Sequence, residues 1–154
     1  MADRHQFRAK WHDYNGGMYF VTLCCAEKRH LFGEINRSEM HLNECGKIAK
    51  DMIDEISLHF PSSQVLNYVI MPNHIHLILF LEDTSGRADP SPTVSNVIGW
   101  LKYNITKDVN LPKGQKLFQR SFYDRVIRNR DEHMEICNYI TLNPENWEND
   151  ELYI

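Results

Sequence analysis

His74 and His76 are the residues whose type and spacing best suit metal chemistry in this sequence. They lie in an apolar stretch that predicts a β-strand, where residues i and i+2 point to the same face about 7 Å apart. Two imidazoles at that separation can tilt toward one ion, whereas unpaired imidazoles buried on a central strand would cost free energy. The pattern is short and common, so the alternative to a metal site is that the two histidines bond to neighbouring backbone or lie exposed. Spacing alone leaves both interpretations open.

A tyrosine and an asparagine near the end of the chain form the second candidate group. Tyr139 and Asn143 are four residues apart in a stretch typical of a helix, so they share one helix face and could supply a nucleophile and an oxygen ligand. Alternatively, Tyr139 packs at the edge of the core and Asn143 ends the helix before Pro144, since the residue before proline avoids the helical region.

Basic residues gather in one part of an otherwise acidic chain. The formal net charge is −4, yet residues 97–130 hold eight Lys and Arg against two Asp, a local charge of +6. Such a stretch suits a localised phosphate contact, although a solvated charged surface explains it equally well. The residues expected to contact phosphates are Lys102, Arg120, Arg125 and Arg128.

The elements that must position these groups follow from hydrophobic patterning and turn residues. The order is β, α, β, β, α, β, α, with a small hairpin over 33–42. The strands are 19–25, 64–71, 74–82 and 116–127; the helices are 44–58, one from Thr93 to Leu111, and 130–143. In strand 74–82, Ile75, Leu77, Leu79 and Leu81 share the face opposite the histidines, which predicts a covering helix layer there. The pattern indicates an α+β sandwich, a mostly antiparallel sheet with helices on one face.

Length and composition predict one domain over residues 1–154. No apolar run approaches the roughly 20 residues that a membrane helix needs, and the polar start Met1–Gln6 lacks a signal-peptide core. We therefore expect a cytoplasmic protein with no membrane partner. The four cysteines are expected to be small hydrophobic residues in a reducing compartment.

The motifs together resemble one family. Met71–His76 is similar to the M-P-x-H-x-H segment of the HUH-class tyrosine transposases, which include small insertion-sequence enzymes and REP-associated tyrosine transposases. The stretch 118–128 resembles the segment that leads into their catalytic helix. Tyr139–Pro144 resembles their Y-I-x-x-N-P signature, most of all that of the REP-associated branch. The resemblance covers roughly residues 17–147.

The resemblance implies a ferredoxin-like (RRM-like) fold whose C-terminal helix carries the tyrosine. It also implies single-stranded or hairpin DNA as substrate, Mg²⁺ or Mn²⁺ as cofactor, and a homodimer. Residue by residue, Tyr139 would be the nucleophile, His74 and His76 the metal ligands, and Asn143 a third ligand. The implied reaction is DNA cleavage and rejoining through a 5′-phosphotyrosine intermediate. Whether Tyr139 would act beside the metal of its own subunit or of a partner stays open.

This chemistry suits those residue types. A metal neutralises a phosphodiester and stabilises the developing charge, and holding the phenol in line with phosphorus can contribute about 7 kcal/mol or more. Hydrolysis by water would favour a general base near the metal. No carboxylate adjoins the histidine pair in sequence, which favours transesterification, although folding could bring one in. The rivals are a domesticated protein that binds hairpin DNA without cutting it, a water-using phosphoesterase, and a structural domain with core histidines.

Overall fold

A four-stranded antiparallel sheet with the order β4-β5-β1-β6 forms the centre of the protein. We describe it from a computed structural model, which defines residues 16–83 and 92–153. The strands of the sheet are β1 (Gly16–Cys24), β4 (Ser63–Met71), β5 (His74–Glu82) and β6 (Tyr123–Val126). A separate hairpin consists of β2 (Gly33–Asn36) and β3 (Glu39–Leu42).

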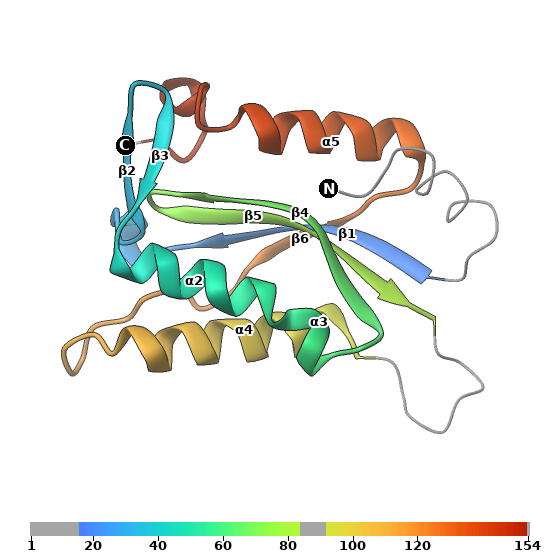
Figure 1. Ribbon diagram of the computed structural model, residues 1–154, viewed down its shortest axis with the longest axis horizontal. Helices are drawn as coiled ribbons and strands as arrows, with labels where there is room; N and C mark the ends of the chain where they lie inside the picture. Colours follow the sequence, from blue (N-terminus) through green and yellow to red (C-terminus); the bar gives the residue numbers. More distant parts are fainter. Residues whose placement is uncertain (1–15, 84–91, 154) are drawn as a thin grey trace.

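Helices cover both faces of the sheet (Figure 1). Helices α2 (Glu44–Asp54) and α4 (Val94–Val109) lie on one face, with the short α3 (Ile56–His59) beside them, and α5 (Arg130–Leu142) lies on the other. Two 3-10 turns, η1 (Ala26–Lys28) and η2 (Trp147–Asn149), complete the described elements. The expected α+β sandwich with an antiparallel sheet is confirmed. The expectation that the helices cover one face is wrong, because Ile136 and Ile140 of α5 pack on the other face of the sheet.

The alternation along β5 assigns its two faces. Ile75, Leu77 and Leu79 are fully buried in the main core, which lies between the sheet and the helices α2 and α4. On the other face Ile78 is fully buried in a smaller cluster with Ile136 and Ile140 of α5. The same strand therefore anchors the main core with one face and docks the tyrosine helix with the other.

Side-chain caps fix where the helices begin. Asn43 accepts a hydrogen bond from Gly46 N (2.9 Å) at the start of α2, and Asn129 accepts one from Glu132 N (2.9 Å) at the start of α5. Thr93 and Asn96 form a reciprocal capping box at the start of α4. The expected starts of these helices are confirmed, whereas the expected helix 44–58 is divided at Glu55 into α2 and α3.

The expected strand over 116–127 is wrong for most of its length. Only Tyr123–Val126 is a strand, preceded by an isolated bridge between Cys25 and Phe118. The ammonium of Lys102 accounts for part of the interruption, because it donates to the carbonyls of Gln119 (2.8 Å) and Arg120 (3.2 Å).

Residues 84–91, which connect β5 to α4, lie outside the described residues. None of the helices in the described ranges combines the length and apolar character that crossing a membrane requires.

Candidate metal and nucleophile site

The two histidines sit side by side in the middle of the sheet. On β5, His74 pairs with Cys24 and His76 with Thr22 of the neighbouring β1. Their side chains are 0% and 4% exposed, and the ring centroids are 4.6 Å apart. Strand alternation thus brings both imidazoles to one face of the sheet, as the sequence predicts, and α5 covers this face.

Each imidazole is oriented by a hydrogen bond at Nδ1. His76 Nδ1 lies 2.8 Å from Thr22 Oγ1, and His74 Nδ1 lies 2.7 Å from Asn73 Oδ1. The Asn73 amide nitrogen donates to the Leu152 carbonyl (2.7 Å), so its oxygen is the atom that faces the ring. Since that oxygen can only accept, His74 Nδ1 carries the proton and donates, which leaves Nε2 free to bind a metal or a proton.

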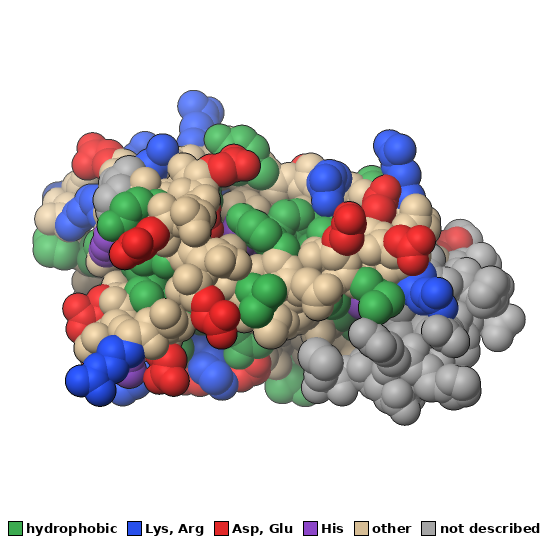
Figure 2. Space-filling view, turned by 90° about the horizontal axis from the view of Figure 1, so that it is seen from above, with side chains coloured by type: hydrophobic (Ala, Val, Ile, Leu, Met, Phe, Trp, Pro, Cys, Tyr) green, Lys and Arg blue, Asp and Glu red, His purple; other side chains and the backbone are tan. Residues whose placement is uncertain are grey.

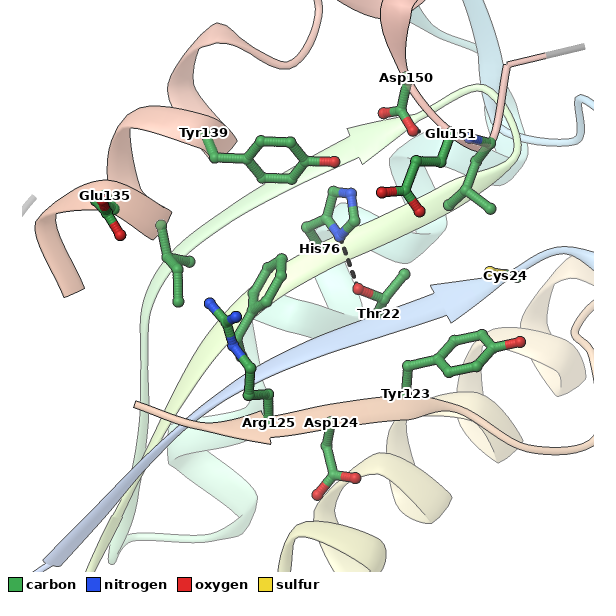
Figure 3. A pocket seen from close by; sticks show the side chains of 13 residues that line it. Thr22, Cys24, His76, Tyr123, Asp124, Arg125, Glu135, Tyr139, Asp150 and Glu151 are labelled. Carbon is green, nitrogen blue, oxygen red and sulfur yellow. Dashed lines mark hydrogen bonds between the residues drawn. The ribbon is translucent and has the colours of Figure 1, made fainter. Parts of the chain in front are cut away.

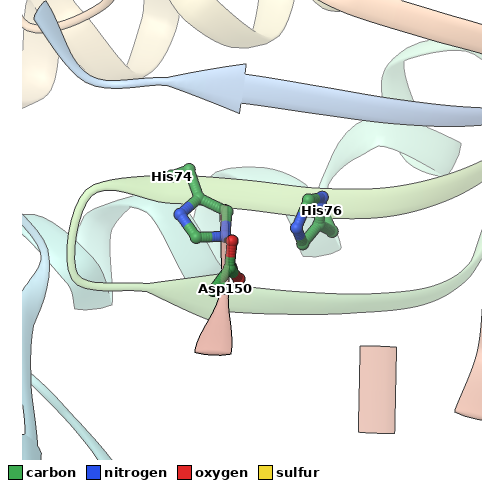
Figure 4. Close-up of side chains that lie close together, drawn as sticks. All are labelled: His74, His76 and Asp150. Atoms are coloured by element: carbon green, nitrogen blue, oxygen red, sulfur yellow. Dashed lines mark ion pairs between the residues drawn. The ribbon is translucent and has the colours of Figure 1, made fainter. Parts of the chain in front are cut away.

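A buried carboxylate completes the group (Figure 4). Asp150 Oδ2 is 3.5 Å from His74 Nε2, and one ligand atom from each of His74, His76 and Asp150 lies within 4.8 Å of the others. At 3.5 Å the Asp150–His74 contact is at the limit of hydrogen-bonding distance, and it is an ion pair only when the imidazole is protonated.

The unpaired atoms of this group point to a cation. Among the described residues, His74 Nε2, His76 Nε2 and Asp150 Oδ2 are buried with no hydrogen-bond partner. Leaving such atoms unpaired costs about 1–3 kcal/mol each. Imidazole nitrogens with a carboxylate oxygen are a donor set that divalent transition metals accept. The residues present therefore fit a divalent metal ion.

Asn143, the expected third ligand, is also buried, at 2% exposure, and its Oδ1 is another buried oxygen with no hydrogen-bond partner among the described residues. It follows the last residue of α5, one turn after Tyr139. Its part in metal binding stays a prediction.

The protonation of the group suits a metal site. Burial and the neighbouring His74 lower the pKa of His76 to about 3, so its imidazole is neutral near pH 7. Burial opposes ionisation of Asp150, but the nearby His74 and the hydrogen bond that Asp150 accepts from the Leu152 backbone outweigh it and hold the pKa of Asp150 below its ordinary value. A neutral imidazole and an ionised carboxylate are the forms that bind metals.

Tyr139 lies next to the histidine pair in the same chain. Its ring centroid is 5.3 Å from that of His76 and 6.2 Å from that of Phe20. Tyr139 is 44% exposed and lines a cavity of about 700 Å³ together with His76 and Asp150. Figure 3 shows its hydroxyl directed into this cavity, toward the side where Asp150 and Glu151 lie.

The phenol is held in its neutral form. Burial and, to a lesser degree, the charge of Asp150 raise the pKa of Tyr139, and a hydrogen bond from Asn143 opposes them only in part. A nucleophilic attack by this oxygen therefore requires loss of its proton during the reaction.

The four basic residues expected at DNA differ in their placement. Arg125 lies on β6, where it pairs with Phe20 of β1, and it lines the cavity. Arg120 and Arg128 are exposed. Lys102 instead holds the two carbonyls before β6, lies 5.8 Å from the centre of the Phe118 ring, and has its pKa lowered by burial. On the face seen from the α5 side, acidic and basic side chains are intermixed (Figure 2).

Asp150 is the site residue that sequence reasoning missed. It belongs to the C-terminal segment, residues 147–153, which folds back after α5. Trp147 anchors this segment: it is 7% exposed, with ring centroids 6.0 Å from His74 and 5.1 Å from Tyr153. The available signal was a tryptophan after the helix stop with an acidic residue three positions later.

Comparison with known structures identifies the class of the fold. A REP-associated tyrosine transposase bound to a REP hairpin superimposes with a TM-score of 0.64 at 21% identity, over 86% of this chain and 70% of that one. A transposase candidate from Deinococcus radiodurans gives a TM-score of 0.52 at 16% identity, over 82% and 90% of the two chains. The chain has the fold of the HUH-type tyrosine transposases.

Sequence comparison then places the chain in a family. A protein of Haemophilus influenzae, itself uncharacterized, is 32% identical over 170 residues, covering 98% of this chain and 93% of the relative. The chain belongs to the same family as this protein. No family model matches it.

Proposed function

We propose that this protein is a metal-dependent tyrosine transposase that cleaves and rejoins single-stranded DNA. The observation that carries the proposal is the juxtaposition within one chain of Tyr139 and His76, which line one cavity, with His74 beside His76. One of the two structural neighbours is a REP-associated tyrosine transposase bound to a REP hairpin, and the other is a transposase candidate. We infer that single-stranded or hairpin DNA is the substrate here as well.

His74, His76 and Asp150 would hold a divalent metal, Mn²⁺ or Mg²⁺, with Asn143 as a further oxygen donor nearby. When bound, the metal supplies charge neutralisation at a non-bridging phosphate oxygen. The residues of the chain do the rest: Thr22 and Asn73 orient the imidazoles, and α5 holds the phenol over the cavity.

In the proposed step, Tyr139 Oη forms a bond to phosphorus as the bond from phosphorus to the 3′ oxygen breaks. The phenol loses its proton to solvent through the open side of the cavity, and the departing 3′ oxygen takes up a proton. The products are a 5′-phosphotyrosine and a free 3′-hydroxyl. Rejoining is the reverse step with the 3′-hydroxyl of another strand, so no nucleotide cofactor is consumed.

Arg125 is the basic residue best placed to contact the DNA backbone beside the reacting phosphate, and Tyr123 on the same edge strand is 65% exposed and available to stack on a base. Arg120 and Arg128 stay predictions as more distant phosphate contacts. The homodimer and the cytoplasmic location also stay predictions. Tyr139 lies beside His76 of its own chain, so the proposed reaction does not require a second subunit.

A covalent-adduct assay tests the proposal. Wild type is incubated with Mn²⁺ and single-stranded hairpin DNA labelled at its 3′ end, the end that stays with the 5′-phosphotyrosine, and a labelled protein band is sought on a denaturing gel. We expect the band with wild type and not with Tyr139→Phe. Tyr123→Phe is the matched control, because this tyrosine lines the same cavity and its variant should still form the adduct.

One rival gains support from Asp150, which places beside the histidines the carboxylate that water-based hydrolysis would need. A phosphoesterase of this kind would cut DNA without an adduct and would remain active as Tyr139→Phe. A protein that binds hairpins without cutting would retard the DNA on a native gel and give neither product nor adduct.

A further inference from the structure

Four contacts form a closed ring around the metal-ligand group. His74 Nδ1 donates to Asn73 Oδ1 (2.7 Å), and Asn73 Nδ2 donates to the Leu152 carbonyl (2.7 Å). The Leu152 amide donates to Asp150 Oδ1 (2.9 Å), and Asp150 Oδ2 faces His74 Nε2 (3.5 Å). The ring starts and ends on His74 and passes through the C-terminal segment on the way.

Asn73 is the member of the ring that joins distant parts of the chain. It lies in the two-residue turn between β4 and β5, is 1% exposed, and is 79 residues from Leu152. One end of its amide accepts from His74 and the other donates to the C-terminal segment, with a second, longer contact to the Lys28 carbonyl at 3.5 Å. Only a side chain with both an acceptor and a donor can make both contacts.

We propose that Asn73 is a positioning residue that couples docking of the C-terminal segment to the orientation of His74, and so delivers Asp150 to the metal. The inference rests on the proposed function for the metal, but the contact of Asn73 with the segment exists without one. Because the two contacts share one amide, metal binding and docking of the segment stabilise each other.

Thr22 provides the comparison. It orients His76 through Oγ1, as Asn73 orients His74, but the hydrogen bond joins it to β5 alone. Thr22→Val should therefore disturb one metal ligand and leave the C-terminal segment docked. Asn73→Ala should disturb both. Asn73→Asp keeps an acceptor for His74 and loses the donor to Leu152, so it should release the C-terminal segment. This variant tests the coupling if Asn73→Ala fails to fold.

Hydrogen exchange followed by mass spectrometry tests the coupling in metal-free protein. Peptides that cover residues 147–153 should exchange about fivefold faster or more in Asn73→Ala and Asn73→Asp, as expected for one lost hydrogen bond, and at the wild-type rate in Thr22→Val. Calorimetry with Mn²⁺ is the second readout. Asn73→Ala should weaken binding roughly 10- to 100-fold, the usual effect of removing a partner of a metal ligand.

The outcomes separate the two proposals. Wild-type exchange in the Asn73 variants, or equal acceleration in Thr22→Val, would overturn the coupling. If Mn²⁺ slows exchange of the segment in wild type and not in Asn73→Ala, the coupling is supported. If wild type binds no Mn²⁺, the proposed metal chemistry fails, and the metal-free exchange rates still decide whether Asn73 holds the segment.

Discussion

Docking of α5 on the sheet should govern whether Tyr139 can react. The helix is held to this face by Ile136 and Ile140, which are 4% and 2% exposed and pack on the fully buried Ile78. Tyr139 lies next to Ile140 in sequence, so any loosening of this contact displaces the phenol. We therefore expect Ile140→Ala to reduce stability and adduct formation together.

The magnitude follows from the atoms removed. Ile140→Ala deletes three buried carbon atoms, worth about 2.4 kcal/mol at ~0.8 kcal/mol per methylene, and the space left raises the loss to about 3 kcal/mol. For a domain of this size the melting temperature should fall by about 6–12 °C. If α5 detaches locally, the detached population rises roughly 100-fold, and we expect the rate of adduct formation to fall about tenfold or more.

Urea unfolding and the adduct assay measure the two effects at a temperature where the variant stays folded. Leu142→Ala is the matched control, because it removes the same number of carbons from the same helix at a side chain that is 44% exposed. It should cost less than about 1 kcal/mol and keep the wild-type rate. A stability loss in Ile140→Ala with an unchanged adduct rate would refute the view that this contact positions Tyr139.

Three shorter predictions follow from the same site. Mn²⁺ at 100 times its dissociation constant should stabilise the protein by about 2.7 kcal/mol, a rise of about 5–11 °C in melting temperature, and His76→Ala should abolish the shift in differential scanning calorimetry. An equimolar mixture of Tyr139→Phe and His76→Ala should form no adduct, because nucleophile and ligands meet within one chain; recovered adduct would show that they are shared between subunits. Burial raises the pKa of Cys25 to about 12, so at pH 8 maleimide should label it far more slowly than the half-buried Cys45, as peptide mass spectrometry would show.

Regular elements account for what the sequence could foretell. The period of two along 74–82 correctly places the histidines opposite Ile75, Leu77 and Leu79, because one face of a central strand has to be apolar where helices cover it. Ile136 and Ile140 dock α5 on the sheet, and Tyr139 of the same helix lies beside His76. The cavity lining includes both His76 and Tyr139, two of the residues that the sequence predicts at the site.

Hydrophobic periodicity could not predict the position of Asp150, because this residue lies outside the helices and strands. Its position depends on a turn after α5, on burial of Trp147 against His74, and on the bond from Asn73 to Leu152, which spans 79 residues. It also changes a chemical argument, since the absence of a carboxylate beside the histidines in sequence had favoured transesterification over hydrolysis. With Asp150 next to the pair, the metal ligands no longer discriminate between the two reactions. Tyr139 distinguishes transesterification from hydrolysis, because its hydroxyl is directed into the cavity (Figure 3) and only transesterification links it to DNA. Detection of a covalent adduct therefore decides the reaction class.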